Sequence, residues 1–202
     1  MLSATGKGPT EALVNSAYKA LRKALTEKPP NWPTAEPEHA WYPSLATFLN
    51  NCVGACRGGL DGSKSATASD PRPRLYDGLK FIVYGMTTED VIEGVAPVKP
   101  DLVGDLDLEP QKPVAWSPQN PHINQVLFPV EIKNHWAPMV DRAATYARCL
   151  FSASPSRHFA VVLGFRHIEP DLRFLVFHRG GLTGSQTLHV KDETGQKDIL
   201  RI

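Results

Sequence analysis

The apolar positions of this chain repeat at helical spacing in three stretches, which predicts amphipathic helices over residues 10–27, 38–53 and 138–152. The positions expected to face the core are, in chain order, Leu13, Ala17, Ala20, Leu21, Ala24 and Leu25, then Trp41, Leu45, Phe48 and Leu49, then Met139, Ala143, Ala147 and Leu150. Pro43 and Pro138 fall near the predicted helix starts, where a proline removes no internal hydrogen bond. Each helix therefore has one face to bury against another layer.

Between and after these helices the pattern changes to short apolar runs that are typical of strands. The runs cover residues 79–84, 95–108, 126–132, 159–165 and 172–177. Stretches rich in proline, glycine and serine separate the elements at residues 29–37, 57–74 and 110–121, and are expected to be loops. The order helix, helix, three strands, helix, two strands predicts an α/β (α+β) domain with a central mixed sheet flanked by helices.

The net charge of the chain excludes two classes of protein. The chain has 202 residues with 22 basic and 21 acidic side chains, so its net charge is +1, which argues against a uniformly basic nucleic-acid coat and against an acidic disordered chain. The charge is nevertheless segregated. Residues 87–111 hold seven acids and one lysine, a net charge of −6, whereas residues 133–179 hold seven Lys or Arg and three acids, a net charge of +4.

The sequence has no apolar run that could cross a membrane and no apolar stretch of the secretion-signal type at residues 1–10. The three cysteines, Cys52, Cys56 and Cys149, are too few for a disulfide framework and are expected to be reduced thiols. We therefore expect an intracellular protein, nuclear or cytoplasmic, without a membrane partner.

Two separate predicted strands carry residues that could perform catalysis. Asp101 follows Lys99 and Pro100 in the second predicted strand, and the third ends in Glu131, Ile132 and Lys133. Residues two apart in a strand share a face, so Glu131 and Lys133 project together. If the two strands are neighbours, Asp101 and Glu131 can share a cation such as magnesium, and Lys133 can orient or deprotonate the attacking water. The alternative is that Glu131 and Lys133 form a solvated ion pair without function.

These residues resemble the motif of the PD-(D/E)xK, or restriction-endonuclease-like, nucleases, whose core runs helix, three strands, helix, strand. The resemblance implies a nuclease that uses Mg²⁺ or Mn²⁺, with Asp101 and Glu131 as metal ligands and Lys133 as the catalytic lysine. It also implies the Ile132 backbone carbonyl as a further ligand. Members often carry another acid on the first core helix, for which Glu38 is the candidate; Glu36 and Glu11 are weaker ones.

A second resemblance covers most of the chain. The segments Lys99–Asp101, Val130–Lys133, Tyr146–Arg148, Arg157–Phe159 and Leu172–Phe174 look like the region that precedes the kinase domain in fungus-specific protein-kinase-like proteins and in Crinkler-type effectors. The resemblance implies a fungal or effector protein, with an adjoining kinase-like domain as partner and a host cell as a further compartment. On this view the chain is one nuclease-like domain, with an N-terminal helix and linker at 1–35, a core at 36–180 and a C-terminal tail at 181–202.

Nucleic-acid contacts are expected along the helix that follows the catalytic strand. Exonuclease-like relatives carry Gln-x-x-x-Tyr there, and this chain has Arg142 and Tyr146, which share a helix face. His135 and Arg148 are the other candidates for binding the nucleic-acid backbone. Arg157 could bind it too or fix the helix, and Trp136 could stack on a base or pack internally.

Alternatives remain for some residues of lesser weight and for the function of the domain as a whole. Asp105, Asp107 and Glu109 could hold a second cation or line a solvated edge, and Trp32, Trp41 and Trp116 are expected to anchor the proline-rich links. The leading hypothesis is a deoxyribonuclease. Its rivals are a nuclease-like module that binds or regulates a kinase-like domain without cutting, and an effector domain that acts through protein contacts.

Overall fold

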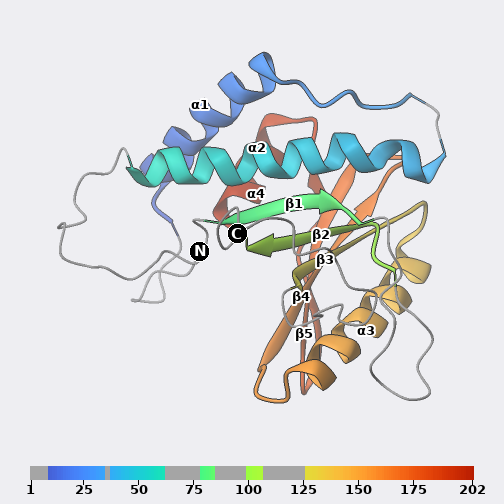
Figure 1. Cartoon of the computed structure of the whole chain (residues 1–202). Coiled ribbons are helices and arrows are strands. Elements are labelled where there is room, and N and C mark those ends of the chain that lie inside the picture. Colours follow the sequence, from blue (N-terminus) through green and yellow to red (C-terminus); the bar gives the residue numbers. More distant parts are fainter. Residues whose placement is uncertain (1–8, 35–36, 62–77, 85–98, 107–125) are drawn as a thin grey trace, which may run out of the picture.

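A computed structural model describes residues 9–34, 37–61, 78–84, 99–106 and 126–202 (Figure 1). Within these ranges the elements are α1 (Glu11–Glu27), the 3₁₀ turn η1 (Glu38–Trp41), α2 (Tyr42–Asp61), β1 (Leu79–Val83), β2 (Leu102–Leu106), β3 (Val126–Lys133), α3 (Trp136–Ala153), β4 (Phe159–Arg166), β5 (Asp171–His178), β6 (Gly181–Gly184), β7 (Leu188–His189) and α4 (Glu193–Arg201). The predicted class is confirmed, since the described chain is a mixed sheet flanked by helices.

The seven described strands form one sheet in the order β1-β2-β3-β4-β5-β6, with β7 also paired to β5. Neighbouring strands are antiparallel except β3 and β4, which are parallel and joined through α3. A parallel pair needs a crossover connection, and α3 supplies it. The acidic and basic residues of β3 stand at its C-terminal end. This end therefore lies beside the start of α3.

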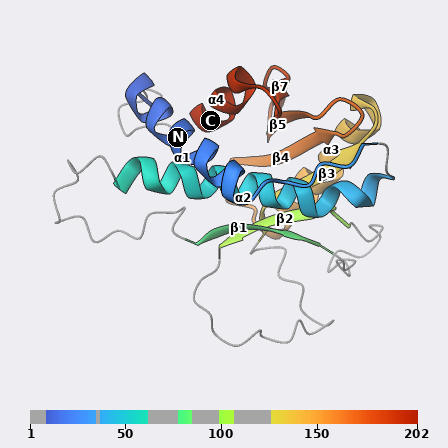
Figure 2. The same ribbon diagram turned by 90° about the horizontal axis from the view of Figure 1, so that it is seen from above.

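The helices form two layers. The helices α1, α2 and α4 cover one face of the sheet, and α3 covers the other (Figure 1). Seen from above, α1 and α4 lie next to each other beside α2 (Figure 2). Successive side chains of β4 point to opposite faces of the sheet, so this strand packs against both helix layers. Phe165 packs into the core under α2, whereas Val162 packs against Ala143 and Tyr146 of α3.

The N-terminal helix matches its prediction within one residue. Thr10 caps α1, since its hydroxyl accepts a hydrogen bond from the Leu13 N–H. The fully buried positions are Val14, Ala17 and Leu21, so the helix is rotated slightly from the expected face, and Leu13 is only half-buried.

The second predicted helix begins as a different structure and ends later than expected. Residues 38–41 form the 3₁₀ turn η1 before α2 starts, and α2 continues to Asp61. The predicted loop at 57–74 is therefore wrong over 57–61, and its remainder lies outside the described residues. The predicted face is confirmed, because Trp41, Leu45, Phe48 and Leu49 are all buried.

The third helix starts at Trp136, two residues before Pro138, which is tolerated in the first turn. Its predicted face is also confirmed, since Met139, Ala143, Ala147 and Leu150 are all buried. Trp32 and Trp41 lie against each other and against Phe165, so both anchor their segments to the core as expected, whereas Trp116 lies outside the described residues.

Four of the five predicted strands appear with shifts of one residue at their ends. Of the run 95–108, only Leu102–Leu106 is a described strand. The prediction of a tail over 181–202 is wrong. This segment forms β6, β7 and α4, and it contributes buried residues to the main core, namely Leu188, Val190, Ile199 and Leu200. It is part of the folded unit.

Two further expectations concern the membrane and the thiols. No helix among the described residues is long and apolar enough to cross a membrane. Cys52, Cys56 and Cys149 are reduced thiols, two of them buried and Cys56 half-buried.

Candidate active site

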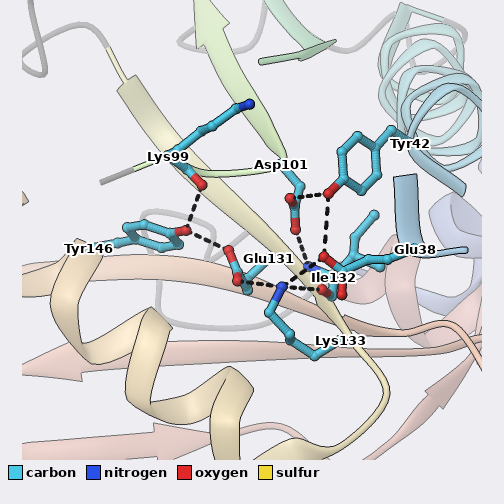
Figure 3. Close-up of polar contacts among 8 residues, drawn as sticks. All are labelled: Glu38, Tyr42, Lys99, Asp101, Glu131, Ile132, Lys133 and Tyr146. Carbon is cyan, nitrogen blue, oxygen red and sulfur yellow. Dashed lines mark hydrogen bonds and ion pairs between the residues drawn. The ribbon is translucent and has the colours of Figure 1, made fainter. Parts of the chain in front are cut away.

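The candidate site is built where β2 and β3 separate. The two strands pair with Leu102 opposite Val130, and β3 then continues to Lys133 alongside β4. Asp101 directly precedes β2, and its Oδ2 accepts a 2.7 Å hydrogen bond from the Ile132 N–H (Figure 3). The Asp101 carboxylate thus accepts the hydrogen bond of a backbone N–H at the edge of β3, which a carbonyl of a longer β2 would otherwise have accepted.

Pro100 explains why the pairing ends at this point. Extending the register by two residues would set Pro100 opposite Ile132. A proline nitrogen carries no hydrogen and cannot donate to the Ile132 carbonyl. That carbonyl instead accepts a 2.8 Å hydrogen bond from Lys133 Nζ. The Pro-Asp pair therefore leaves a carboxylate and a backbone carbonyl at the same strand edge.

Glu131 is the more deeply buried of the two acids, with 3% of its surface exposed. Its Oε2 accepts a 2.5 Å hydrogen bond from the hydroxyl of Tyr146 on α3, which also lies 3.0 Å from the Lys99 carbonyl oxygen. Its Oε1 lies 2.9 Å from Lys133 Nζ. Each oxygen of the Glu131 carboxylate thus has a polar partner, Tyr146 from α3 for Oε2 and Lys133 from the same strand for Oε1.

Lys133 binds three oxygens with its ammonium group. Besides Glu131 Oε1, its Nζ donates to Glu38 Oε1 at 2.8 Å and to the Ile132 carbonyl at 2.8 Å. An ammonium group has three N–H donors, so these three acceptors use all of them. Glu38 reaches the strand end from η1, as Figure 3 shows.

Tyr42 closes the network from the first residue of α2. Its hydroxyl donates a short hydrogen bond to Asp101 Oδ1 and lies 3.4 Å from Glu38 Oε1. Glu38 and Tyr42 are four residues apart across the η1–α2 junction, and the helical turn brings both to the strand edge. The result is a closed ring of polar contacts from Asp101 through Tyr42, Glu38 and Lys133 to Ile132 and back (Figure 3).

Burial dominates the electrostatics of the two acids. It raises the pKa of Asp101, against the opposing hydrogen bonds from Tyr42 and Ile132. It also raises the pKa of Glu131, and the neighbouring charge on Asp101 raises it further. For Lys133, burial lowers the pKa, but the bonds to Glu38 and Glu131 outweigh that effect and raise it overall. The site therefore holds two carboxylates that are costly to charge and an ammonium that stays protonated.

The donor set suits a hard divalent cation. Asp101, Glu131 and the Ile132 carbonyl supply only oxygen atoms, which Mg²⁺ and Mn²⁺ prefer, and a cation would offset the repulsion between the two carboxylates. In the described part of the chain, no group of three or more His, Cys, Asp or Glu side chains is arranged to hold a metal. Glu38, the further candidate acid, contacts Lys133 and Tyr42.

The other nucleic-acid candidates are dispersed. Arg142 is exposed one turn before Tyr146, and its charge lowers the Tyr146 pKa while burial and Glu131 raise it more. His135 is exposed directly before α3. Arg148 instead lines a groove between α3 and β5–β6, together with Phe151, Phe177 and Arg179 among others, and is not part of the network around Glu131.

Several weaker candidates separate from the site or lie outside the described residues. Glu11 pairs with Arg201 of α4. Trp136 is half-buried, and the Arg173 guanidinium covers its ring 4.3 Å from the centroid, where a base would have to stack. The side chains of Glu36, Asp105, Asp107 and Glu109 lie outside the described residues.

Sequence reasoning did not identify Tyr42 or the role of the Lys99 carbonyl. A signal for Tyr42 exists in its spacing of four from Glu38 at a helix start, but that spacing points to a shared face and not to a partner 59 residues away. The contact of the Lys99 carbonyl depends on where α3 docks, which no local pattern reveals.

Comparison of the chain with protein-family models, with curated proteins and with solved structures found no match. The geometry of the site and the order of the surrounding elements are therefore the observations from which a function can be inferred.

Proposed function

We propose that this chain is a nuclease of the PD-(D/E)xK, restriction-endonuclease-like kind, which hydrolyses phosphodiester bonds of DNA with Mg²⁺ or Mn²⁺. The observation that carries the proposal is the meeting of Asp101, Glu131 and Lys133 at one strand edge, although Asp101 is 30 residues from Glu131 in the sequence. A solvated ion pair at a strand end would not need a second buried carboxylate beside it.

The order and direction of the elements support the same proposal. The run α2-β1-β2-β3-α3-β4 contains an antiparallel meander of three strands, a crossover helix and a fourth strand parallel to the third. This is the order expected for a restriction-endonuclease-like core. Asp101 directly precedes the second strand of the meander and Glu131 lies on the third, as the motif requires.

The chain's own residues would divide the work as follows. Asp101, Glu131 and the Ile132 carbonyl would hold the divalent cation, which when bound supplies Lewis-acid activation of the scissile phosphate. Tyr42 and Tyr146 fix the two carboxylates by hydrogen bonds. Lys133 is held as an ammonium, so it would orient water and stabilise negative charge on the phosphate through its N–H donors, and would not act as a base.

The test is cleavage of supercoiled and linear DNA by the whole chain with Mg²⁺, with Mn²⁺ and with a chelator. We expect cleavage with either metal, no cleavage with chelator, and a loss of at least about 100-fold in Asp101→Asn, Glu131→Gln and Lys133→Met. Lys197→Met is the matched control, because Lys197 also forms an ion pair and its side chain is 25% exposed, as is that of Lys133.

Two results would overturn the proposal. Equal cleavage by the wild type and the three site variants would assign the activity to a contaminant or to another site. No cleavage by the wild type on DNA or RNA would favour the non-cutting alternative, a module that binds or regulates an adjoining kinase-like domain. Thermal unfolding of each variant shows whether a loss of activity reflects chemistry or folding.

A further inference from the structure

Lys133 occupies a position that a cation would take. Its Nζ lies 2.9 Å from Glu131 Oε1 and 2.8 Å from the Ile132 carbonyl oxygen. These are two of the three protein groups that the proposed function assigns to the metal. An ammonium group and a divalent cation on the same oxygens would repel each other strongly at such distances, so each weakens the binding of the other.

The protein needs a counter-charge at this position. Glu131 is almost completely buried, and a buried carboxylate without a partner is strongly destabilising. Asp101 lies close enough for its charge to add to the cost of charging Glu131. Lys133 is the cation in the described part of the chain that contacts Glu131, so its ammonium balances the site in the structure as it stands.

A second partner for the ammonium is already in contact with it. Glu38 Oε1 accepts from Lys133 Nζ at 2.8 Å and comes from a different element, η1. The Glu38 side chain is 33% exposed, so it can follow the ammonium toward solvent more easily than buried Glu131 can. Tyr42, which also bonds Asp101, contacts the same Glu38 oxygen.

We propose that Lys133 is the resident counter-cation of this site and competes with the divalent metal for Glu131 and the Ile132 carbonyl, while Glu38 retains the displaced ammonium. Glu38 is then a positioning residue for Lys133 and not a metal ligand. The inference rests on the proposed function for the identity of the cation site, and it adds how occupancy of that site is regulated.

The first experiment measures Mn²⁺ affinity of the whole chain by titration calorimetry and by the electron-spin signal of free Mn²⁺, without nucleic acid. Lys133→Met should bind Mn²⁺ about 10- to 100-fold more tightly than the wild type, the size of one charged hydrogen bond. Lys99→Met is the control for charge alone, because Lys99 is exposed and its amine makes none of the contacts drawn among the site residues (Figure 3). It should change affinity by less than about threefold, since exposed charges are screened.

The second experiment separates the two possible roles of Glu38 by a double-mutant cycle. Glu38→Gln in the wild type should weaken Mn²⁺ binding, because the ammonium then has no other carboxylate to move to. In the Lys133→Met background the same change should have no effect on affinity. If Glu38 were a metal ligand, Glu38→Gln would weaken binding in both backgrounds, and this part of the inference would be refuted.

Folding is controlled by a milder variant. Lys133→Gln keeps N–H donors for Glu131 and Glu38 but removes the charge, and it should show a smaller gain in Mn²⁺ affinity of the same sign. Both variants should melt at a lower temperature than the wild type without metal and gain more from saturating Mn²⁺. Unchanged or weaker Mn²⁺ binding by folded Lys133→Met and Lys133→Gln, or no binding by any form, would overturn the inference.

The outcome can be distinguished from failure of the proposed function. If the affinities follow the expected pattern but no nucleic acid is cut, the competition stands and the nuclease proposal fails. If cutting is observed and depends on Asp101 but the affinities do not change, the nuclease stands and Lys133 is not a competitor.

Discussion

Replacing Gly164 with alanine is expected to destabilise the protein and to disturb the candidate site. Gly164 lies on β4 opposite Glu131 of β3, under the first turns of α3. A Cβ atom there would collide with the Met139 Sδ, and would lie 3.3 Å from Met139 Cγ and 3.4 Å from the Trp136 ring. Met139 is completely buried, so its side chain has little room to move aside.

The size of the effect can be worked out from these contacts. Overpacking of a dense core costs about 1–3 kcal/mol, and a collision with a fully buried neighbour belongs in the upper part, about 2–3 kcal/mol. Alanine also reduces the entropy of the unfolded chain, which offsets about 0.5–1 kcal/mol. The free energy of unfolding should therefore fall by about 1–2.5 kcal/mol, since helix α3 must shift to accept the methyl group.

The assay is urea unfolding followed by far-ultraviolet circular dichroism, with Gly54→Ala as the matched control. Gly54 lies inside α2, and a Cβ atom added there would meet no neighbouring atom within 4 Å, so the same substitution should stabilise by about 0.5–1 kcal/mol. Opposite signs for the two variants are expected. Equal stability of Gly164→Ala and the wild type would refute the close approach of α3 to β4 at this point.

Three further predictions concern Asp101 of the candidate site, Gly195 of α4 and the arginines of α3. Asp101→Asn should be more stable than the wild type at pH 7 without divalent cations, and the difference in unfolding free energy should shrink as the pH is lowered toward about 4, the ordinary pKa of an aspartate. The sign follows because burial raises the folded-state pKa of Asp101, so its charged form costs stability at neutral pH; a constant difference would contradict it. Gly195→Ala should destabilise by about 3 kcal/mol or more in the same urea assay, because the Cβ would overlap the His189 backbone, which cannot give way as a side chain can; a wild-type midpoint would refute the docking of α4. Arg142→Ala should weaken DNA binding and lower the salt slope by about one, whereas Arg148→Ala should change neither; equal effects in fluorescence anisotropy would show that α3 does not orient its arginines as described.

The parts of the fold that could be predicted are those with strong local periodicity. Every position expected on the buried faces of the second and third predicted helices is buried, since a helix of 3.6 residues per turn determines which positions share a face. The strands β1, β3, β4 and β5 are predictable because each is a short apolar run of the kind typical of strands. The segment after His178 was missed because β6 and β7 are four and two residues long and α4 is polar on most of its surface, so their burial depends on distant partners.

The candidate site divides in the same way. Glu131 and Lys133 are expected to lie on one face because a strand repeats every two residues, and the structure brings them together at 2.9 Å. Asp101 could be linked to them only by assuming that its strand is a neighbour. The local signal for Tyr42, its spacing of four from Glu38, does not point to its partner Asp101, which lies 59 residues away.

The sequence by itself determined the alternation that sends Ile132 into the core and Glu131 and Lys133 to the opposite side, together with the Pro-Asp pair that cannot continue a ladder. Local chain geometry suffices for both, because the direction of a side chain and the missing proline N–H do not depend on the rest of the protein. Only the tertiary structure decided that the η1–α2 junction brings Glu38 and Tyr42 to the same strand edge, and that α3 brings Tyr146 to Glu131. Those contacts depend on how the helices dock on the sheet, which the burial of apolar faces across the whole chain determines.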